Sequence, residues 1–297
     1  MSKRYKHQPY TGFYIRDPKV RHIHKAAARD RVMHHAIFRI LNPFFDKTFI
    51  SNSFSCRIGK GVHKGVTAVE RMIRSESRNF TRPCFALKCD VQKFFDSVDQ
   101  QVLLSILEKR IADPETMLLI RQVIESYSAG QTTLFDRQGI PIGNLTSQLF
   151  ANVYMNEFDQ FIKHTMRIEH YARYTDDFVI ISTDKKYLEG LLEPIREYLH
   201  TRLKLKLHPK KISLRACHQG VDFLGYVALP SHRLVRAKTR QRIFRKLRYR
   251  ISQYRSGIIS ENALSQTLQS YLGILSHANA HQLTQDLKNQ YWFWLHE

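Results

Sequence analysis

Two adjacent carboxylates stand between two apolar runs in the stretch YARYTDDFVIIS, which spans residues 171–182. The runs read as buried strands, and an unpaired charge buried between them would cost several kcal/mol. Asp176 and Asp177 must therefore be either solvated at a turn or held by a cation. The stretch alone favours the turn in water, because most Asp-Asp pairs between strands are turn residues. The rest of the chain decides between a plain hairpin and a cation site.

A third carboxylate changes the balance between these two interpretations. The sequence LKCDVQKFFDSVD puts Asp90 at the end of another apolar strand. Carboxylates on adjacent strands can hold two hard metal ions about 4 Å apart, which activate a 3′-hydroxyl and stabilise the phosphate under transfer. Either element alone is a weak signal. The chain order of Asp90, GIPIGNLTSQLFAN, YTDD, HPKK and FLGY is specific, and it favours nucleotidyl transfer.

The charge balance indicates the class of partner. Lys and Arg total 47 against 26 Asp and Glu, which gives a net charge of +21 and predicts a polyanionic partner. No apolar run reaches the ~18–20 residues of a membrane span, and no apolar segment follows MSKRYKHQPY, so nucleic acid is expected rather than membrane. The four cysteines form no CxxC pair, so neither a zinc site nor a disulfide framework is expected, and a cytoplasmic location fits.

Hydrophobic periodicity predicts most of the remaining elements. A helix is expected from Ala26 to Leu41, ended by Asn42-Pro43, with one apolar face that comprises Val32, Met33, Ala36, Ile37, Ile40 and Leu41. The first thirty residues look irregular or β-like, with a turn at Asp17-Pro18, and GKGVHKG (59–65) reads as a basic loop near nucleic acid. The further predictions are helices over 99–111, 114–127, 145–165, 185–202 and from Arg236 onward, short strands around 204–207, 211–215 and 221–228, and a Gly-rich loop or hairpin over 130–144.

The segment from Arg236 to Arg255 has an unusual charge pattern. Nine of its twenty residues are Lys or Arg and none is acidic, while Ile243, Phe244, Leu247 and Ile251 form an apolar stripe. Such a helix can pack on one side and lie along phosphates on the other. The alternative is a solvated basic face. The expected phosphate contacts are those of Arg236, Lys238, Arg242, Arg245, Lys246 and Arg248.

The ordered blocks resemble the palm of the reverse transcriptases, the RNA-directed DNA polymerases. The resemblance implies that Asp90, Asp176 and Asp177 are the catalytic carboxylates. It further implies that they hold two Mg²⁺ ions, for which Mn²⁺ can substitute, together with the backbone carbonyl of Val91. The implied partners are a template RNA, the RNA–DNA duplex and deoxynucleoside triphosphates. FLGY resembles the primer-grip turn, which assigns that role to Phe223, Leu224 and Gly225.

The same resemblance assigns residues to the incoming nucleotide. Phe95, rather than its neighbour Phe94, falls where these enzymes place the bulky residue that excludes a ribose 2′-OH. Lys210 or Lys211 resembles the lysine that protonates the leaving pyrophosphate, and the sequence does not distinguish them. ARDRVMHH resembles a block whose arginines hold the triphosphate, and a structural role is the alternative for each. The nucleotide-binding candidates are thus Phe95, Ile142, Gly143, Gln148, Arg21, Arg29, Arg31, Lys210 and Lys211.

The loop before the predicted long helix narrows the resemblance to one group of reverse transcriptases. PIGNLTSQ has Ile142 where most bacterial relatives have glutamine, and Gln148 where they have proline. This form is similar to the reverse transcriptases of diversity-generating retroelements, as are GKGVHKG and SYLGILSHANAHQL (270–283). That family implies a bacterial or phage-encoded enzyme that copies a template RNA, misincorporates opposite adenines and so diversifies a target gene. It also implies a small basic accessory protein.

Ile142 suggests a physical reason for such errors. An apolar side chain at this position would lower the cost of a mispair, which is normally an unmet hydrogen bond. The alternative is that Ile142 only packs the loop. The whole chain has two competing interpretations. One is a defence-associated or intron-like reverse transcriptase, and the other is a catalytically inactive RNA-binding palm.

The expected architecture is that of an α/β (α+β) right-hand polymerase. We expect fingers with a short N-terminal part over residues 1–80 and a ferredoxin-like palm with the catalytic carboxylates over 81–232. A helical basic thumb is expected over 233–297.

Overall fold

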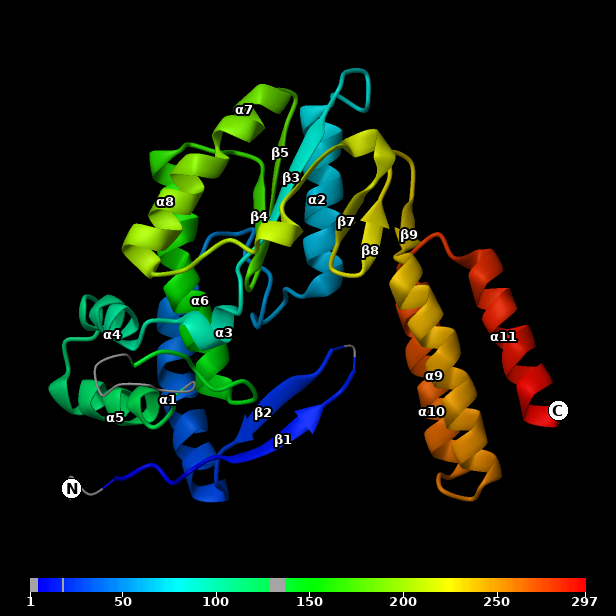
Figure 1. The fold of residues 1–297 in the computed structure, drawn as a ribbon, viewed down its shortest axis with the longest axis horizontal. Coiled ribbons are helices and arrows are strands. Elements are labelled where there is room, and N and C mark those ends of the chain that lie inside the picture. Colours follow the sequence, from blue (N-terminus) through cyan, green and yellow to red (C-terminus); the bar gives the residue numbers. More distant parts are fainter. Residues whose placement is uncertain (1–4, 18, 129–136) are drawn as a thin grey trace.

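The computed structural model describes residues 5–17, 19–128 and 137–297. Within them the fold is mixed α/β, as predicted (Figure 1). The strands are β1 (Thr11–Ile15), β2 (Arg21–Lys25), β3 (Phe85–Asp90), β4 (Tyr171–Tyr174), β5 (Asp177–Ser182), β6 (Ser213–Ala216), β7 (Val221–Phe223), β8 (Tyr226–Ala228) and β9 (Arg233–Val235). The α-helices are α1 (Ala28–Asp46), α2 (Val62–Glu76), α3 (Phe94–Ser97), α4 (Gln100–Glu108), α5 (Pro114–Glu125), α6 (Leu145–Gln160), α7 (Lys185–Gly190), α8 (Leu192–Leu203), α9 (Ala237–Arg255), α10 (Glu261–Leu275) and α11 (His281–His296).

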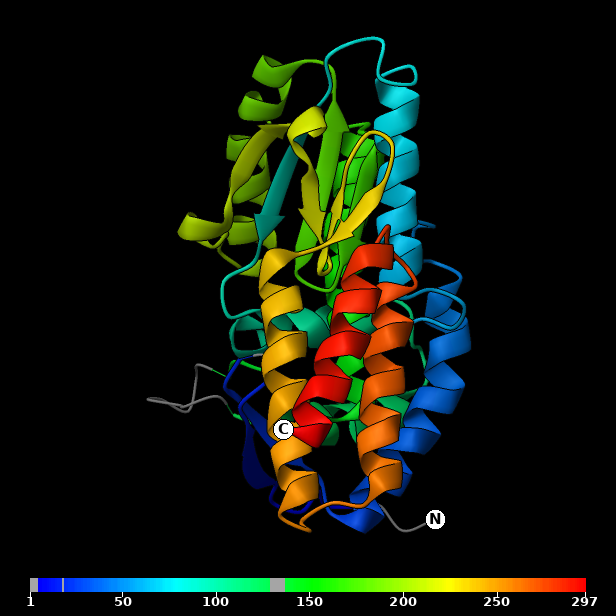
Figure 2. The same cartoon turned by 90° about the vertical axis from the view of Figure 1, so that its right-hand side faces the viewer.

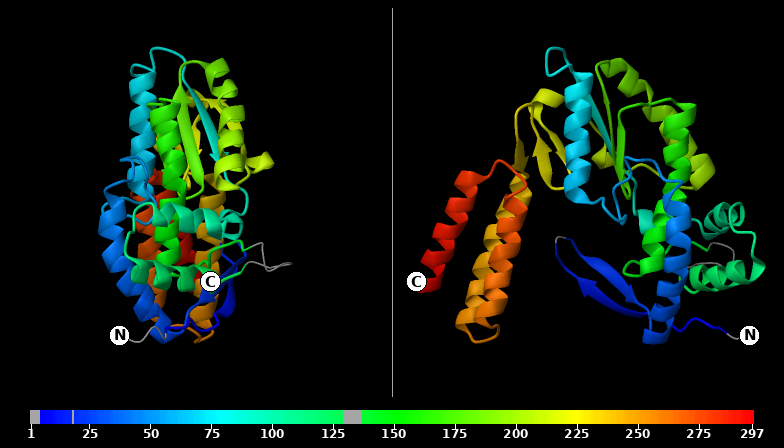
Figure 3. Two further views of the ribbon diagram at one scale, coloured as in Figure 1. Left: turned by 90° about the vertical axis from the view of Figure 1, so that its left-hand side faces the viewer. Right: turned by 180° about the vertical axis from the view of Figure 1, so that it is seen from behind.

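The central sheet has four antiparallel strands in the order β4-β5-β3-β6. With α6 between β3 and β4 and α8 between β5 and β6, the chain follows the ferredoxin-like β-α-β-β-α-β order. Helices α6 and α8 cover one face of this sheet and α2 covers the other (Figures 1 and 3). Alternate side chains of the strands enter the two cores: Leu87 and Phe178 pack on the α6 side, and Ala86 and Val179 on the α2 side.

Two further units flank this sheet. The β1–β2 hairpin extends below it towards the helices α9 and α10 (Figures 1 and 3). The helices α9, α10 and α11 form a bundle around Leu247, Leu264 and Leu287. At the end of the hairpin, Asp17 forms an ion pair with Lys246 of α9. Across the described residues, no helix combines the length and apolar composition that a membrane crossing needs.

The prediction for the first long helix was wrong at its end and on its buried face. Helix α1 continues through Asn42-Pro43 to Asp46, because Phe45, only 1% exposed, keeps the last turn packed in the core. Val32 and Ile40, predicted to be buried, are 70% and 72% exposed. Polar residues take their place on the buried face, where their hydrogen bonds are satisfied: His34 contacts Thr146, and Asp30 accepts from Tyr5 and Gln8.

The prediction that GKGVHKG is a loop was also wrong for its second half. Helix α2 begins at Val62, after Gly61 at φ +114°. Gly65 lies against the β7–β8 turn, where an added Cβ would stand 2.9 Å from Cδ1 of Leu224. The glycine therefore allows a helix and a turn to approach closely, and its packing explains its place in the motif.

The other element predictions were largely confirmed. The helix predicted over 145–165 is α6 followed by a π-turn (161–165), and the helix predicted over 185–202 divides into α7 and α8 at Leu191. The strand expected over 204–207 is not formed; Leu207 makes only an isolated bridge with Val91. Residue 18 of the predicted Asp17-Pro18 turn, and residues 130–136 of the predicted loop, lie outside the described residues.

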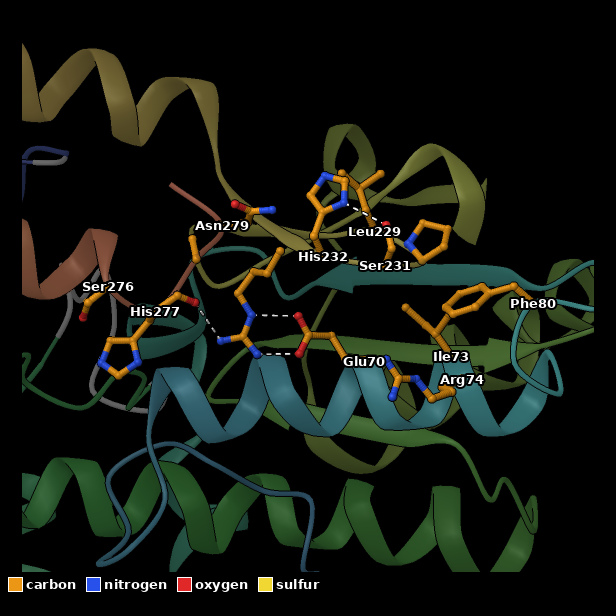
Figure 4. A pocket seen from close by; sticks show the side chains of 13 residues that line it. Glu70, Ile73, Arg74, Phe80, Leu229, Ser231, His232, Ser276, His277 and Asn279 are labelled. Carbon is orange, nitrogen blue, oxygen red and sulfur yellow. Dashed lines mark hydrogen bonds and ion pairs between the residues drawn. The ribbon is translucent and has the colours of Figure 1, made fainter. Parts of the chain in front are cut away.

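Arg233 of β9 connects the sheets with the helical bundle. Its guanidinium donates to Glu70 and Thr67 of α2 and to the carbonyl of His277, which precedes α11. Its own carbonyl accepts from the backbone N–H of Asn279 at 2.7 Å. Glu70, His277 and Asn279 border a cavity of about 410 Å³ (Figure 4). One side chain thus fixes α2, β9 and the α10–α11 connection relative to one another.

A buried ion pair anchors the β4–β5 hairpin. Arg173 and Asp159 have fully buried side chains and form two hydrogen bonds, from Nε to Oδ1 at 2.7 Å and from Nη2 to Oδ2 at 2.6 Å. The hydroxyl of Tyr171 donates to the same carboxylate at 2.7 Å, and Arg173 also donates to Ser53. Because both charges are paired and hydrogen-bonded, their burial is tolerated.

Loss of one partner of this pair should be strongly destabilising. Asp159→Asn leaves the Arg173 guanidinium buried without a counter-charge, so we expect the free energy of unfolding to fall by about 3–5 kcal/mol. Glu108→Gln removes the exposed pair with Arg121 and should cost at most about 1 kcal/mol. Urea unfolding of the two variants measures both values, and equal losses would contradict the role of the buried pair.

Candidate active site

The two adjacent aspartates lie at the turn of the β4–β5 hairpin. Tyr174 and Asp177 face each other across the strands, so Thr175 and Asp176 form a two-residue turn. Thr175 has φ +56°, a rare conformation for a β-branched residue. Its hydroxyl donates to Ser55 at 2.6 Å, and its carbonyl accepts from Nη1 of Arg173 at 3.0 Å. The surrounding contacts thus hold the turn in a strained shape.

The structure brings the three predicted carboxylates together. Asp90 at the end of β3 stands directly opposite Asp177 at the start of β5, where paired residues lie about 5 Å apart between their Cα atoms. The backbone N–H of Val91 donates to the carbonyl of Asp176 at 3.0 Å, which fixes the turn against the end of β3. The sheet register therefore pairs Asp90 with Asp177, and the fixed turn adds Asp176 to the cluster.

Two lysines contact the cluster. Nζ of Lys211 lies 2.6 Å from Oδ1 of Asp90, and Nζ of Lys88 lies 3.2 Å from Oδ2 of Asp177. Of the two lysines left open by the sequence, Lys211 therefore reaches a carboxylate, whereas the N–H of Lys210 only caps the turn at His208. Lys88 was missed. The sequence could have indicated it, because Lys88 precedes Asp90 by two residues on one strand and residues at this spacing share a face of the sheet.

Burial disfavours the charged form of both turn carboxylates. It raises the pKa of Asp176, with a further contribution from Asp90. It raises the pKa of Asp177 to about 6, although Lys88 acts in the opposite direction. Oδ1 of Asp177 is buried and has no hydrogen-bond partner among the described residues. The cluster thus holds more negative charge than its lysines satisfy.

An additional cation fits this cluster. Carboxylate oxygens are the ligands that Mg²⁺ prefers, and the orphaned Oδ1 of Asp177 offers one of them. With Lys88 and Lys211 in their ion pairs, no three His, Cys, Asp or Glu side chains of the described residues stand as a ready metal-binding group. Asp90, Asp176 and Asp177 would hold a metal ion after these lysines yield.

A cleft of about 280 Å³ opens beside Asp90. Its charged lining is mostly cationic and suits a phosphate-bearing ligand. The cations are Lys88, Lys210, Lys211, Arg215 and Arg236. Arg236 is paired with Asp222, which lines the same cleft.

The structure separates the two neighbouring phenylalanines. Phe94 is 2% exposed and belongs to the core, whereas Phe95 is half-buried and its carbonyl accepts from the N–H of Ile140 at 2.8 Å. Phe95 is thus the ring with an accessible surface near Asp90. The assignment of Phe95 rather than Phe94 as the nucleotide contact stays a prediction.

The loop before α6 is docked onto β2. The carbonyl of Ile142 accepts from the N–H of His24 at 2.9 Å, and the side chain of Asn144 donates to the carbonyl of His24 at 2.8 Å. Gly143 has φ +113°, and an added Cβ would stand 2.7 Å from Ile23. The side chain of Ile142 is half-buried, and that of Gln148 is exposed on α6.

Of the three candidate arginines, the structure brings only Arg21 near the carboxylates. Its charge on β2 lowers the pKa of Asp176, although burial has the larger, opposite effect. Arg29 instead donates to the carbonyl of Lys6 at 2.6 Å, and Arg31 is exposed on α1. The sequence motif did not distinguish these positions.

The FLGY segment forms a tight turn between β7 and β8. Leu224 and Gly225 have φ +52° and +91°, the conformation of a two-residue hairpin turn. Phe223 is fully buried, and its ring lies 5.9 Å from Nζ of Lys88. The carbonyl of Gly225 accepts from the N–H of Arg236, which links this turn to the start of α9.

The raised pKa of Asp177 has a consequence for stability. The carboxyl of Asp177 has a pKa of about 4 in the unfolded chain and of about 6 in the folded protein. Ionisation of Asp177 therefore lowers the free energy of unfolding, and this loss is absent below pH 4 and complete above pH 6. Asp177→Asn cannot ionise, so its Tm should exceed that of the parent by about 2–6 °C at pH 8 and by less at pH 4.5. Thermal melts at both pH values test this, with Glu193→Gln on the exposed face of α8 as the control. An equal change at both pH values would contradict the burial effect.

Comparison with known proteins is consistent with this geometry. Residues 15–228 match the family model described as Reverse transcriptase (RNA-dependent DNA polymerase). Protein YkfC of Escherichia coli is 27% identical over 276 residues, which cover 81% of this chain and 70% of that protein. The group II intron-encoded protein LtrA of Lactococcus lactis is 21% identical over 285 residues, which cover 74% of this chain and 46% of that protein.

Solved structures with the same fold include two telomerases. Apo telomerase from Candida tropicalis has a TM-score of 0.59 at 13% identity, with 99% of this chain and 60% of that chain covered. Telomerase from Candida albicans with a fragment of telomeric RNA has a TM-score of 0.57 at 12% identity, with 98% and 55% covered. The chain thus spans less than two thirds of LtrA and of these telomerases. This likeness confirms the right-hand polymerase fold. Because the family model covers well over half of the 297 residues, the chain belongs to the reverse transcriptase (RNA-dependent DNA polymerase) family.

Proposed function

We propose that this chain copies a template RNA into cDNA at the cluster of Asp90, Asp176 and Asp177. The observation that carries the proposal is a hairpin turn held in a strained conformation, which presents two half-buried carboxylates beside a third. A plain surface turn would leave them solvated, whereas burial here raises the pKa of both turn carboxylates. Proteins tolerate the free-energy cost of burying carboxylates at sites where the carboxylates bind a ligand or take part in a reaction.

The cluster would act through divalent metal ions, with Mg²⁺ as the expected ion and Mn²⁺ as a substitute. Bound there, the ions would activate the 3′-hydroxyl of the primer and stabilise the charge on the transferred phosphate. Asp90, Asp176 and Asp177 would hold them, with the carbonyl of Val91 as a further ligand. The observation that supports this assignment is the orphaned Oδ1 of Asp177.

Other residues would bind and orient the substrates. Arg21 would bind the triphosphate, and the half-exposed ring of Phe95 would clash with a ribose 2′-OH. Lys211, which lines the cationic cleft beside Asp90, would hold a proton for the leaving pyrophosphate. The turn at Leu224 and Gly225 would support the primer end. Gly143 and Gln148 would line the nucleotide site, while Arg29 and Arg31 have no observed support for that role.

We also propose the division into fingers (1–80), palm (81–232) and thumb (233–297). The β1–β2 hairpin and the α9–α11 bundle face each other below the sheet, an arrangement that suits an RNA–DNA duplex between them (Figure 1). Template RNA, the RNA–DNA duplex and deoxynucleoside triphosphates would be the ligands.

The catalytic assignment predicts the outcome of one conservative substitution. Asp176→Asn removes a metal-binding charge worth several kcal/mol in the transition state, so RNA-templated cDNA synthesis should fall by about 1000-fold. The measurement is primer extension with Mg²⁺ and four deoxynucleotides, with binding of the RNA–DNA duplex measured alongside. Glu193→Gln should retain full activity. If Asp176→Asn stayed active, or if no condition supported synthesis although RNA was bound, an inactive RNA-binding palm would be the better account.

The finer proposal is that synthesis is error-prone opposite template adenines and diversifies a target gene with the help of a small basic accessory protein. It rests on the PIGNLTSQ form of the loop and on Ile142. The β2 strand holds this loop through His24, so the side chain at position 142 has a fixed environment. The relationship to a group II intron-encoded protein favours an intron-like enzyme equally well.

Sequencing of the cDNA separates these two functions. If Ile142 lowers the cost of a mispair, Ile142→Gln should reduce errors opposite template adenine by about fivefold, because a polar contact restores roughly 1 kcal/mol of discrimination. Ile142→Leu keeps an apolar side chain of the same size and should leave the error spectrum unchanged. Assays with and without the accessory protein complete the comparison. Accurate products from the parent chain would point to the intron-like or defence-associated alternative.

A further inference from the structure

The cations of α9 lie on different faces of the helix. Lys246 forms its ion pair with Asp17 of the β1–β2 hairpin. Arg250 of α9 donates to the hydroxyl of Thr267 in α10, and Arg242 lies four residues before Lys246 on the same face of α9. These three cations therefore lie on the side of α9 that faces the hairpin and α10. They are the residues of α9 best placed to contact a duplex between the hairpin and the bundle.

Arg245 and Arg248 lie on another face, beside α11. They line a groove of about 560 Å³ together with Phe244, Tyr249, Ser252 and Trp294. Helix α11 lies on the side of α9 away from the hairpin (Figures 1 and 2). The groove between α9 and α11 is thus separate from the cleft that holds the carboxylates.

The groove combines stacking surfaces with free positive charge. The guanidinium of Arg248 lies 5.8 Å from the ring centre of Trp294, and Phe244 meets the same ring edge-on. The ring of Tyr249 is 62% exposed. Across residues 5–17, 19–128 and 137–297, neither Arg245 nor Arg248 forms an ion pair with a carboxylate.

This combination selects one class of ligand. Exposed aromatic rings bind unpaired bases by stacking, and neighbouring guanidinium groups bind the phosphates between them. A duplex keeps its bases stacked on one another and cannot use such rings. A basic protein segment would bring like charge to Arg245 and Arg248, so it does not suit this groove.

We propose that the α9–α11 groove binds a single-stranded RNA segment outside the catalytic cleft. The proposal rests on the proposed function for the identity of the nucleic acid, because a reverse transcriptase works on RNA. An unpaired part of the template held in this groove would keep the RNA attached while its copied part occupies the cleft.

Binding in the presence of a filled cleft tests the proposal. The full chain is first saturated with a blunt RNA–DNA duplex, and the Kd of a fluorescein-labelled twelve-nucleotide oligouridylate is then measured by anisotropy. Tyr249→Ala and Arg248→Gln should each weaken oligouridylate binding by about tenfold, since stacking on an aromatic ring contributes about 1–3 kcal/mol per base. Both side chains are exposed, so the bundle core remains intact. Arg240→Ala, an exposed arginine of α9 outside the groove, should change the Kd by less than twofold.

Three results would overturn the proposal. The duplex could displace the oligouridylate, or the two groove variants could lose duplex and oligouridylate affinity by the same factor; in either case the groove would be part of the cleft. Oligoglutamate could bind with the same dependence on Tyr249 and Arg248, which would assign the groove to an acidic protein. Asp176→Asn should leave oligouridylate binding unchanged, so failure of catalysis and failure of the groove are distinguishable.

Discussion

The buried pair of Arg173 and Asp159 is the interaction on which the candidate site depends most. Arg173 lies two residues before the strained Thr175 and donates to its carbonyl, while Asp159 fixes the guanidinium from α6. The pair thus connects the long helix on one face of the sheet with the turn that presents the aspartates. A hydrophobic pair could fill the same space, but it could not hold the carbonyl of Thr175. The polar network therefore determines the direction of the turn rather than only its stability.

The site itself combines carboxylates and lysines in a small volume. Asp90 and Asp177 are brought together by sheet register, and Lys88 and Lys211 reduce the repulsion that results. The lysines lie at the cleft edge and are partly exposed, so they can leave the carboxylates at little cost when a stronger cation or a phosphate arrives. A protein that carries +21 overall thus keeps a local negative cluster at the site that we propose for a metal-dependent reaction.

Local sequence patterns predicted the elements that present the site, but not the contacts that fix them. The hairpin, the strand that ends at Asp90 and the long helix that begins at Leu145 follow from hydrophobic periodicity and turn chemistry, and the structure contains all three. The sequence pattern did not identify the carboxylate that pairs with Arg173, although a buried arginine within an apolar strand requires such a partner. The buried Asp30 and His34 of α1 were missed for the same reason, because their partners lie in distant segments. The short strand expected over 204–207 failed because isolated β-propensity cannot specify a neighbouring strand.

The packing of helix α9, and not its number of cations, determines which ligands those cations can contact. The sequence treats the nine cations of residues 236–255 as one basic surface, since no acidic residue interrupts them. The apolar stripe of Ile243, Leu247 and Ile251 faces the bundle, and this one constraint fixes the direction of every other side chain on the helix. Lys246 then faces the hairpin, and Arg248 faces Trp294. Cations on different faces of one helix cannot all follow the same nucleic acid strand, so the packing of three aliphatic residues divides one basic segment into two surfaces.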